Sequence, residues 1–122
     1  MGIRGENPIV EKSYAFALRI VKFYNHHVSV HKEFVLSKQL LCCETSIGAN
    51  VHEGIGVQSR NDFISKMSIA YKEARETCYW VRLLRDSEYL ETRLADSLLA
   101  DADELCRILA AILLTTKAND AE

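Results

Sequence analysis

The sequence predicts an all-α protein: an up-down-up-down, left-handed antiparallel four-helix bundle, formed by a single domain over residues 1–122. Three observations support this prediction. Apolar residues recur at alternating spacings of three and four along four long segments, as they do in helices that pack side by side. The chain has one proline and five glycines, which favours long uninterrupted elements. Short polar links separate the segments, and short links make neighbouring helices antiparallel.

The first helix is predicted at approximately 9–27, where Pro8 suits the start of a helix. It carries two apolar stripes about 100° apart. The second stripe consists of Phe16, Ile20 and Phe23. Because one stripe is enough for a bundle core, the surplus residues either lie deep in the core or cover a partner. The first stripe consists of Val10, Tyr14, Ala17, Val21, Tyr24 and Val28.

Three histidines, His26, His27 and His31, follow near the end of this helix. They raise the question of a metal site, but no set of helix-borne ligands with acidic support accompanies them. The sequence therefore predicts a fraying helix end and a polar loop at this point, and no metal.

The second helix is predicted at approximately 34–54. A polar stripe runs beside its apolar seam, and such side chains usually hydrogen-bond to a loop or to a neighbouring helix. A binding role for the stripe is the alternative. Gly54 and Gly56 are expected to end the helix, since glycine adopts the left-handed conformation without steric cost. The stripe consists of Gln39, Ser46, Asn50 and Glu53.

The third helix is predicted at approximately 60–85. Ser59 is expected to cap it, Asp62 suits its positive end, and Phe63 begins the apolar seam. Glu73 and Glu76 lie one turn apart further along. Paired carboxylates can perform acid–base chemistry. No nucleophile motif or phosphate loop accompanies this pair, so salt bridges or hydrogen bonds to a helix end are expected instead.

The fourth helix is predicted at approximately 91–117, and it also carries two apolar stripes. Surplus stripes on the first and fourth helices would leave a large apolar patch on a monomer, which soluble monomers rarely tolerate. The sequence therefore predicts a homo-oligomer. Its candidate interface residues are Phe16, Ile20, Phe23, Leu109 and Leu113.

Charge and cysteine content restrict the function. The net charge of −2 does not indicate a nucleic-acid-binding protein. Residues 1–85 carry 12 Lys and Arg against 8 Asp and Glu, whereas residues 86–122 carry 3 against 9. The acidic last helix is either a solvated face or complementary to another copy. The four cysteines have no CxxC spacing, and the sequence shows no signal peptide. It also has no apolar run of about 20 residues. We therefore expect a cytoplasmic protein with no membrane span.

A motif in the centre of the chain carries a family resemblance. Its residues are Gln39, Leu40, Ser46, Ile47, Ala49, Asn50, Glu53, Gly54, Gly56, Ser59, Asp62 and Phe63. Matches also occur at Ser68–Ala70, Lys72–Glu73, Glu76–Thr77 and Tyr79–Trp80. With these residues the chain resembles the four-helix-bundle proteins first noticed as reading frames inside intervening sequences of bacterial 23S ribosomal RNA genes.

The resemblance implies an up-and-down helical bundle that assembles as a homopentamer, with no established enzymatic activity. A related group, the accessory proteins of diversity-generating retroelements, binds nucleic acid and a reverse transcriptase. The chain departs from the family at Cys42, Cys43 and Val57, where the family often has arginine, and these departures argue against carrying RNA binding over to this chain.

We therefore expect a non-catalytic, self-assembling bundle that needs no cofactor. The alternative is an RNA- or nucleoprotein-binding accessory module. An enzyme is a third hypothesis, supported only by the Glu73 and Glu76 pair.

Overall fold

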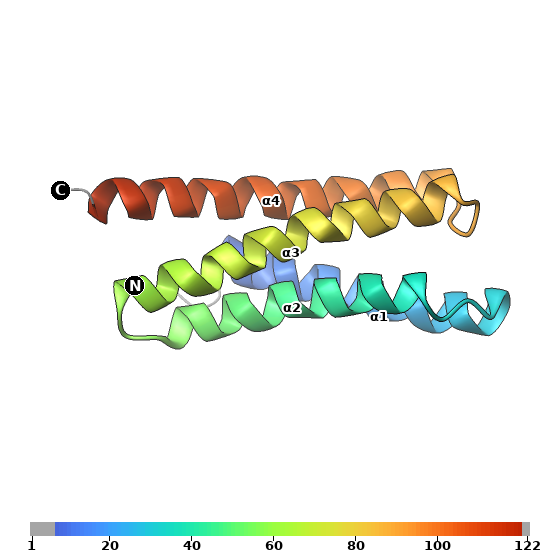
Figure 1. The fold of residues 1–122 in the computed structure, drawn as a ribbon, viewed down its shortest axis with the longest axis horizontal. Helices are drawn as coiled ribbons and strands as arrows, with labels where there is room; N and C mark the ends of the chain where they lie inside the picture. Colours follow the sequence, from blue (N-terminus) through green and yellow to red (C-terminus); the bar gives the residue numbers. More distant parts are fainter. Residues whose placement is uncertain (1–6, 121–122) are drawn as a thin grey trace.

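The computed structural model describes residues 7–120, which form four helices and no strand. The helices are α1 (Pro8–His31), α2 (Leu36–Gly56), α3 (Arg60–Asp86) and α4 (Thr92–Asp120). Successive helices run in opposite directions (Figure 1). The sequence prediction of an all-α fold with four helices is confirmed, while the left-handed twist of the bundle stays a prediction.

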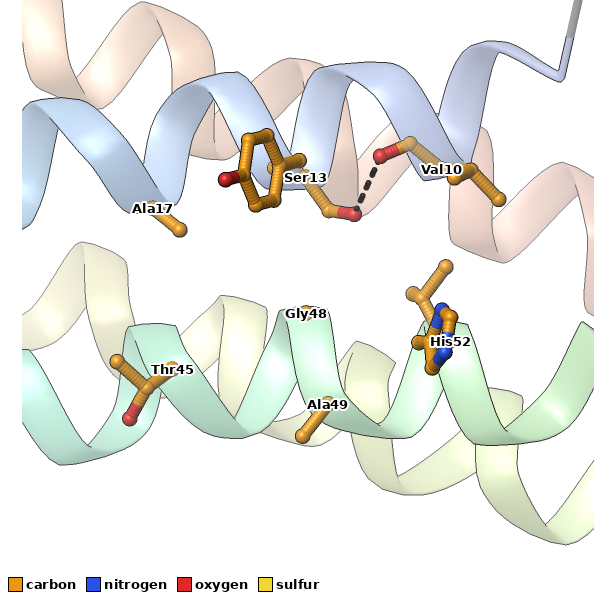
Figure 2. Close-up of a pocket in the computed structure, with 9 residues that line it drawn as sticks. Val10, Ser13, Ala17, Thr45, Gly48, Ala49 and His52 are labelled. Carbon is orange, nitrogen blue, oxygen red and sulfur yellow. Dashed lines mark hydrogen bonds between the residues drawn. The ribbon is translucent and has the colours of Figure 1, made fainter. Parts of the chain in front are cut away.

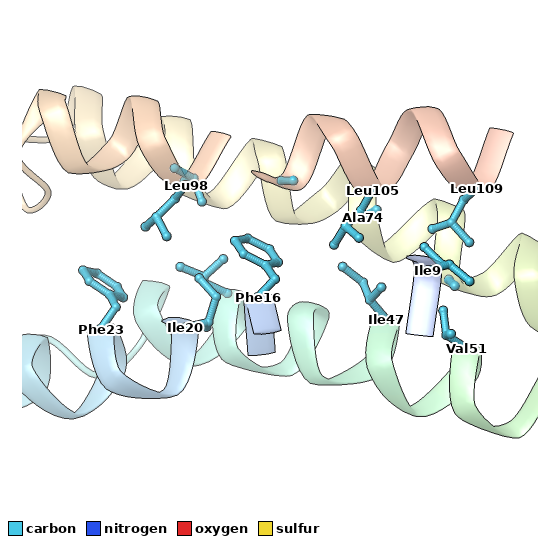
Figure 3. Close-up of a cluster of buried hydrophobic side chains, with 14 of the residues drawn as sticks. Ile9, Phe16, Ile20, Phe23, Ile47, Val51, Ala74, Leu98, Leu105 and Leu109 are labelled. Carbon is cyan, nitrogen blue, oxygen red and sulfur yellow. The ribbon is translucent and has the colours of Figure 1, made fainter. Parts of the chain in front are cut away.

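Helix packing is uneven around the bundle. α2 packs extensively against α3, and α3 against α4, whereas α1 lies mainly on α2 and touches α4 more sparsely. Two fully buried alanines of α3, Ala70 and Ala74, allow its close approach to its neighbours. Large side chains from the other three helices lie around Ala74 (Figure 3), and Ala70 belongs to the same core cluster.

The core corrects the predicted oligomer interface. Phe16, Ile20, Phe23 and Leu109 are all buried inside a single chain, where no second copy can reach them (Figure 3). Leu113 is half-buried and packs against the same core. Periodicity gives the angle between two apolar stripes on a helix but not which of them faces inward. In α1 the three-residue stripe faces inward, whereas the longer stripe is half-buried, with Tyr14 and Val21 exposed.

The ends of α1 also differ from the prediction. Asn7 caps its start, where the Ile9 N–H donates to Asn7 Oδ1 at 3.2 Å. The helix continues past His27 to His31 and stops at Lys32, whose φ of 57° is left-handed. The expected fraying at residue 27 is wrong because His27 is buried and its ring packs between those of Phe23 and His31 on the same helix.

Gly54 and Gly56 do not end α2 in the way the sequence suggested. Gly54 lies within the helix and Gly56 is its last residue, so the helix does end at Gly56, but no glycine in the described part of the chain has a positive φ. Gly54 instead permits close contact with α3. A Cβ atom placed on it would lie 2.6 Å from Met67 Cε and 3.1 Å from Lys66 Cβ, whereas one placed on Gly56 would meet nothing within 4 Å.

Replacing Gly54 with valine is therefore expected to lower the free energy of unfolding by about 1–3 kcal/mol through overpacking. The Met67 methyl group can move aside, but Lys66 Cβ moves only with the α3 backbone. Gly56→Ala is the matched control, and it should be neutral or stabilising by up to about 1 kcal/mol. Urea unfolding followed by helical circular dichroism measures both, and equal stabilities for the two variants would contradict this role of Gly54.

The start of α3 confirms the predicted cap. Ser59 Oγ accepts a hydrogen bond from the Asp62 N–H at 3.0 Å, and Asp62 lies in the first turn. Beside this turn, Lys66 Nζ lies 2.8 Å from Glu53 Oε1 and so joins α3 to α2. The connection between the two helices is thus held from both sides.

Ion pairs connect the acidic α4 to other helices of the same chain. Arg19 of α1 lies 2.6 Å from Asp101, and its guanidinium also donates to Ser97 Oγ at 3.1 Å. Lys12 lies 3.2 Å from Glu104. The charge difference between the two parts of the sequence is therefore at least partly matched inside one chain, which weakens the case for complementarity between copies.

Candidate functional site

An apolar groove runs between α1 and α2, with a volume of about 370 Å³. Figure 2 shows α1 on one side of it, with Ser13 and Ala17, and α2 on the other, with Gly48 and His52. None of the nine residues that line it is a lysine, arginine, aspartate or glutamate. They are Val10, Ser13, Tyr14, Ala17, Thr45, Gly48, Ala49, Val51 and His52.

Small side chains leave this groove open. A Cβ atom placed on Gly48 would meet no other atom within 4 Å. The one buried hydroxyl on the α1 side is already satisfied, because Ser13 Oγ donates to the Val10 carbonyl oxygen at 3.2 Å. The groove therefore presents apolar surface with few free polar groups.

Large apolar side chains continue this surface along the outer face of α1. Tyr14 is 67% exposed, Leu18 is 50% exposed and Val21 is 39% exposed. Two of them, Tyr14 and Val21, belong to the stripe that the sequence singled out as the first seam of this helix. We call the groove together with Leu18 and Val21 the α1–α2 apolar face.

Glu73 and Glu76 converge on a cysteine of α2. Ligand atoms of Cys43, Glu73 and Glu76 lie within 4.8 Å of one another, and Cys43 Sγ donates to Glu76 Oε1 at 3.5 Å. Burial and the negative charge of Glu73 raise the pKa of the Cys43 thiol to about 12. The thiol thus stays protonated and acts as a hydrogen-bond donor to the carboxylates. One sulfur and two carboxylate oxygens could offer three ligands to a metal ion. Glu76 is exposed, however, and the thiol proton of Cys43 already forms a hydrogen bond with its carboxylate.

Both carboxylates have partners nearby. Lys72 Nζ lies 4.0 Å from Glu73, which agrees with the expected salt bridge. The hydrogen bond of Glu76 goes to a thiol of the neighbouring helix and not to a helix end. No nucleophile of raised reactivity stands beside either carboxylate in the described structure, since the pKa of Cys43 is raised.

The other motif residues are spread along the bundle. Asn50 donates to the Ser46 carbonyl oxygen at 2.8 Å and to Ser46 Oγ at 3.1 Å, so this part of the polar stripe bonds within α2. Gln39 is exposed, as is Glu53 in its ion pair with Lys66. These motif residues thus make contacts within α2 and between α2 and α3, and they do not gather into one pocket.

The core contains a carboxyl group that sequence reasoning missed. Glu44 of α2 is fully buried, and neither of its oxygens has a hydrogen-bond partner in the described structure. Burial raises the pKa of this carboxyl to about 8. The sequence spacing could have revealed this burial. Four residues of α2 follow one another at intervals of four, three and four and so share one face of the helix: Leu40, Glu44, Ile47 and Val51.

A second buried polar group joins α1 to α2. The imidazole of His27 donates from Nε2 to Glu33 Oε1 at 3.0 Å. Glu33 also accepts from the backbone N–H groups of Val35, Leu36 and Ser37, at 2.7, 2.6 and 3.1 Å. Burial raises the pKa of Glu33, but these hydrogen bonds together lower it below its ordinary value. Glu33 therefore caps α2 from the preceding loop.

Comparison with known proteins identifies the family. The model of the 23S rRNA-intervening sequence protein family matches residues 5–111. The chain belongs to this family. The resemblance expected from the central motif is confirmed, and the intervening-sequence motif residues can be placed in the structure as described above.

A solved member supports the same family fold. It is a protein of unknown function from the S23 ribosomal protein family of Bacteroides thetaiotaomicron, with 47% sequence identity and a TM-score of 0.84. The match covers 86% of this chain and 97% of that one. No curated protein matches the chain. The intervening-sequence family and its solved member thus give this chain a fold without a biochemical role.

The helices also show no sign of a membrane segment. Between residues 7 and 120, none contains an apolar stretch of the length that crossing a bilayer demands.

Proposed function

We propose that this intervening-sequence protein is a non-catalytic, self-assembling bundle whose copies meet through the α1–α2 apolar face. The observation that carries the proposal is the exposure of Tyr14, Leu18 and Val21 beside a groove lined mainly by apolar and small residues. Exposed apolar residues that form a continuous patch mark interaction surfaces more often than isolated ones do. The interface thus moves to the outer stripe of α1, away from the core residues that the sequence suggested.

A second copy is the occupant that fits this face. The groove has no lysine, arginine, aspartate or glutamate with which a highly charged partner could pair, and its small residues allow another helix to come close. Interfaces between identical subunits are more apolar than transient ones. The family resemblance sets the expected number of copies at five, which is about 69 kDa, five times the 13.8 kDa of one chain.

Light scattering coupled to size exclusion tests this proposal at micromolar concentration. The native chain should elute as an oligomer near the mass of five copies, and the double variant Tyr14→Glu and Leu18→Glu should elute as a folded monomer, because a charge buried without a partner opposes association. Leu114→Glu is the matched control, since Leu114 is 73% exposed on α4 and outside the face. A native chain that is monomeric, or a double variant that assembles like the control, would overturn the proposal.

Absence of catalysis and a cytoplasmic location belong to the same proposal. Cys42, Cys43, Cys78 and Cys106 are all free thiols, which suits a reducing compartment. The carboxylate pair at Glu73 and Glu76 has a hydrogen-bonding role that accounts for it without a reaction.

RNA or nucleoprotein binding is the second candidate function. Arg75 and Arg82 are exposed on α3, and the matching family is named for an intervening sequence of ribosomal RNA. With a net charge of −2, we expect any RNA affinity to be weak and to fall steeply as salt increases. Binding of structured ribosomal RNA that survives physiological salt and is lost in an Arg75→Gln and Arg82→Gln variant would place this candidate first.

A further inference from the structure

A second groove, of about 400 Å³, lies between α3 and α4, and it is lined by residues of both helices. Two of its lining residues are cysteines, Cys78 of α3 and Cys106 of α4. Three arginines share the same groove, Arg75 and Arg82 from α3 and Arg107 from α4. The groove therefore combines two thiols from facing helices with a concentration of positive charge.

The two thiols face the same groove from neighbouring helices, although the residues are 28 positions apart in sequence. Both are half-buried and pack against the core on one side, while the groove gives access from the other. Free cysteines placed only to fill a core would be enclosed, as Cys43 is.

The groove also distinguishes one thiol from the other. The hydrogen bond from Cys106 lowers the pKa of Cys78, with a further contribution from Arg82 and Arg75, whereas burial and Asp103 oppose it. The same hydrogen bond and burial raise the pKa of Cys106. Cys78 is therefore the thiol that loses its proton first, and thiolates are the form that attacks disulfides.

Charge pairing inside the groove leaves two of its arginines available. Arg107 is engaged with Asp103 of its own helix. Arg75 donates to the Tyr71 hydroxyl at 3.3 Å and lies over the same ring, contacts that do not neutralise its charge. Arg82 has no carboxylate within ion-pairing distance in the described structure. The entrance to the thiols is thus positively charged.

We propose that Cys78 and Cys106 form a redox-active dithiol that reacts with small, negatively charged disulfides. The Cys78 thiolate attacks one sulfur of the disulfide, a bond forms between them, and the first small thiolate leaves. Cys106 then loses its proton and attacks the Cys78 sulfur, and the second small thiolate leaves. In all, two protein thiols are oxidised by two electrons, the small disulfide is reduced to two thiolates, and two protons are released.

The experiment uses dithiobis(nitrobenzoate), a disulfide with two carboxylates, on the full chain carrying Cys42→Ser so that the exposed Cys42 does not contribute. At neutral pH we expect two thionitrobenzoates released per chain, a protein mass lower by two hydrogens, and recovery of the starting mass with dithiothreitol. With Cys106→Ser added, one thionitrobenzoate should be released and the other retained on Cys78. With Cys78→Ser added instead, the reaction should slow roughly tenfold, because Cys106 lacks a favourable thiolate.

Selectivity for anions is measured with the same protein. Arg75→Gln and Arg82→Gln together should slow the reaction with dithiobis(nitrobenzoate) by about tenfold. They should leave the rate with cystamine, a cationic disulfide, unchanged or higher. The same measurement on urea-unfolded protein gives the reaction rate of these thiols when the groove is absent.

Three results would overturn the proposal. The first is a protein that retains two nitrobenzoate adducts without closing a disulfide. The second is a disulfide that links two chains. The third is a rate that does not change when Cys78 is replaced. Each readout is independent of assembly, so a monomeric chain would end the proposed function and leave this inference open to the same test.

Discussion

Replacing Glu44 with glutamine is expected to raise the free energy of unfolding above pH 8 by about 2–4 kcal/mol, and far less at pH 5. Burial raises the pKa of this carboxyl from an ordinary value of 4.5 to about 8 in the folded protein. The folded state then holds a proton that the unfolded chain has already released. Stability is therefore greatest below pH 4.5 as far as this group is concerned, and it falls as the pH rises towards 8. Glutamine stays neutral throughout and removes that loss.

Urea unfolding at pH 5 and at pH 9 measures the difference. Glu53→Gln is the matched control on the same helix, because Glu53 is exposed and pairs with Lys66 at the surface. The native chain should have clearly different free energies of unfolding at pH 5 and at pH 9. The two values for the Glu44→Gln variant should be closer together. If the native chain is as stable at pH 9 as at pH 5, an unseen partner must satisfy the Glu44 carboxylate.

Replacing Glu33 with alanine should have a comparable effect in the opposite direction, a loss of about 2–4 kcal/mol. One carboxylate accepts from three N–H groups at the start of α2 and from the buried imidazole of His27. Alanine would leave these donors unpaired, and His27 Nδ1 already has no partner in the described structure. Thermal unfolding at pH 7 measures the loss.

The sign of the pH dependence gives a further check on Glu33. Its pKa is lowered in the folded protein, so its contribution is present above the ordinary value of 4.5 and is lost as the pH falls through the lowered value. Glu33→Gln keeps an acceptor oxygen without a charge and should lie between the native chain and the alanine variant at pH 7. A glutamine variant as weak as alanine would mean that charge, and not acceptor geometry, caps α2.

Apolar spacing alone predicted four helices, because a stripe that alternates at three and four residues over several turns matches the helical period and not the period of a strand. It did not predict which stripe of α1 faces inward. Phe16 and Ile20 form one such stripe and Tyr14 and Val21 the other, and both have helical spacing. The choice depends on how α2 and α4 lie against α1, and that is a property of the assembled bundle.

The polar residues likewise divide into those whose role the sequence reveals and those whose role depends on the folded bundle. Ser59 could be identified as a cap because its partner, the Asp62 N–H, lies three residues away. The partner of Cys43 lies on another helix, as does Cys106, which shares a groove with Cys78, so no local pattern reveals either pair. Glu44 was missed for another reason: its seam position was visible, but a carboxylate in a seam is usually interpreted as a surface residue.

The sparse contact between α1 and α4 gives this bundle a preferred place to open. α1 is fastened to α4 partly through Lys12 and Arg19, whose ion pairs with Glu104 and Asp101 are exposed to solvent and weakened by salt. The α2–α3 and α3–α4 contacts are far more extensive, so they depend less on their own exposed ion pairs. Partial unfolding should therefore begin at this edge, with α1 swinging away while α2, α3 and α4 stay together. A chain that opens there exposes Phe16 and Ile20, the residues of its own core, and it is the form most exposed to proteolysis and to exchange of α1 between copies.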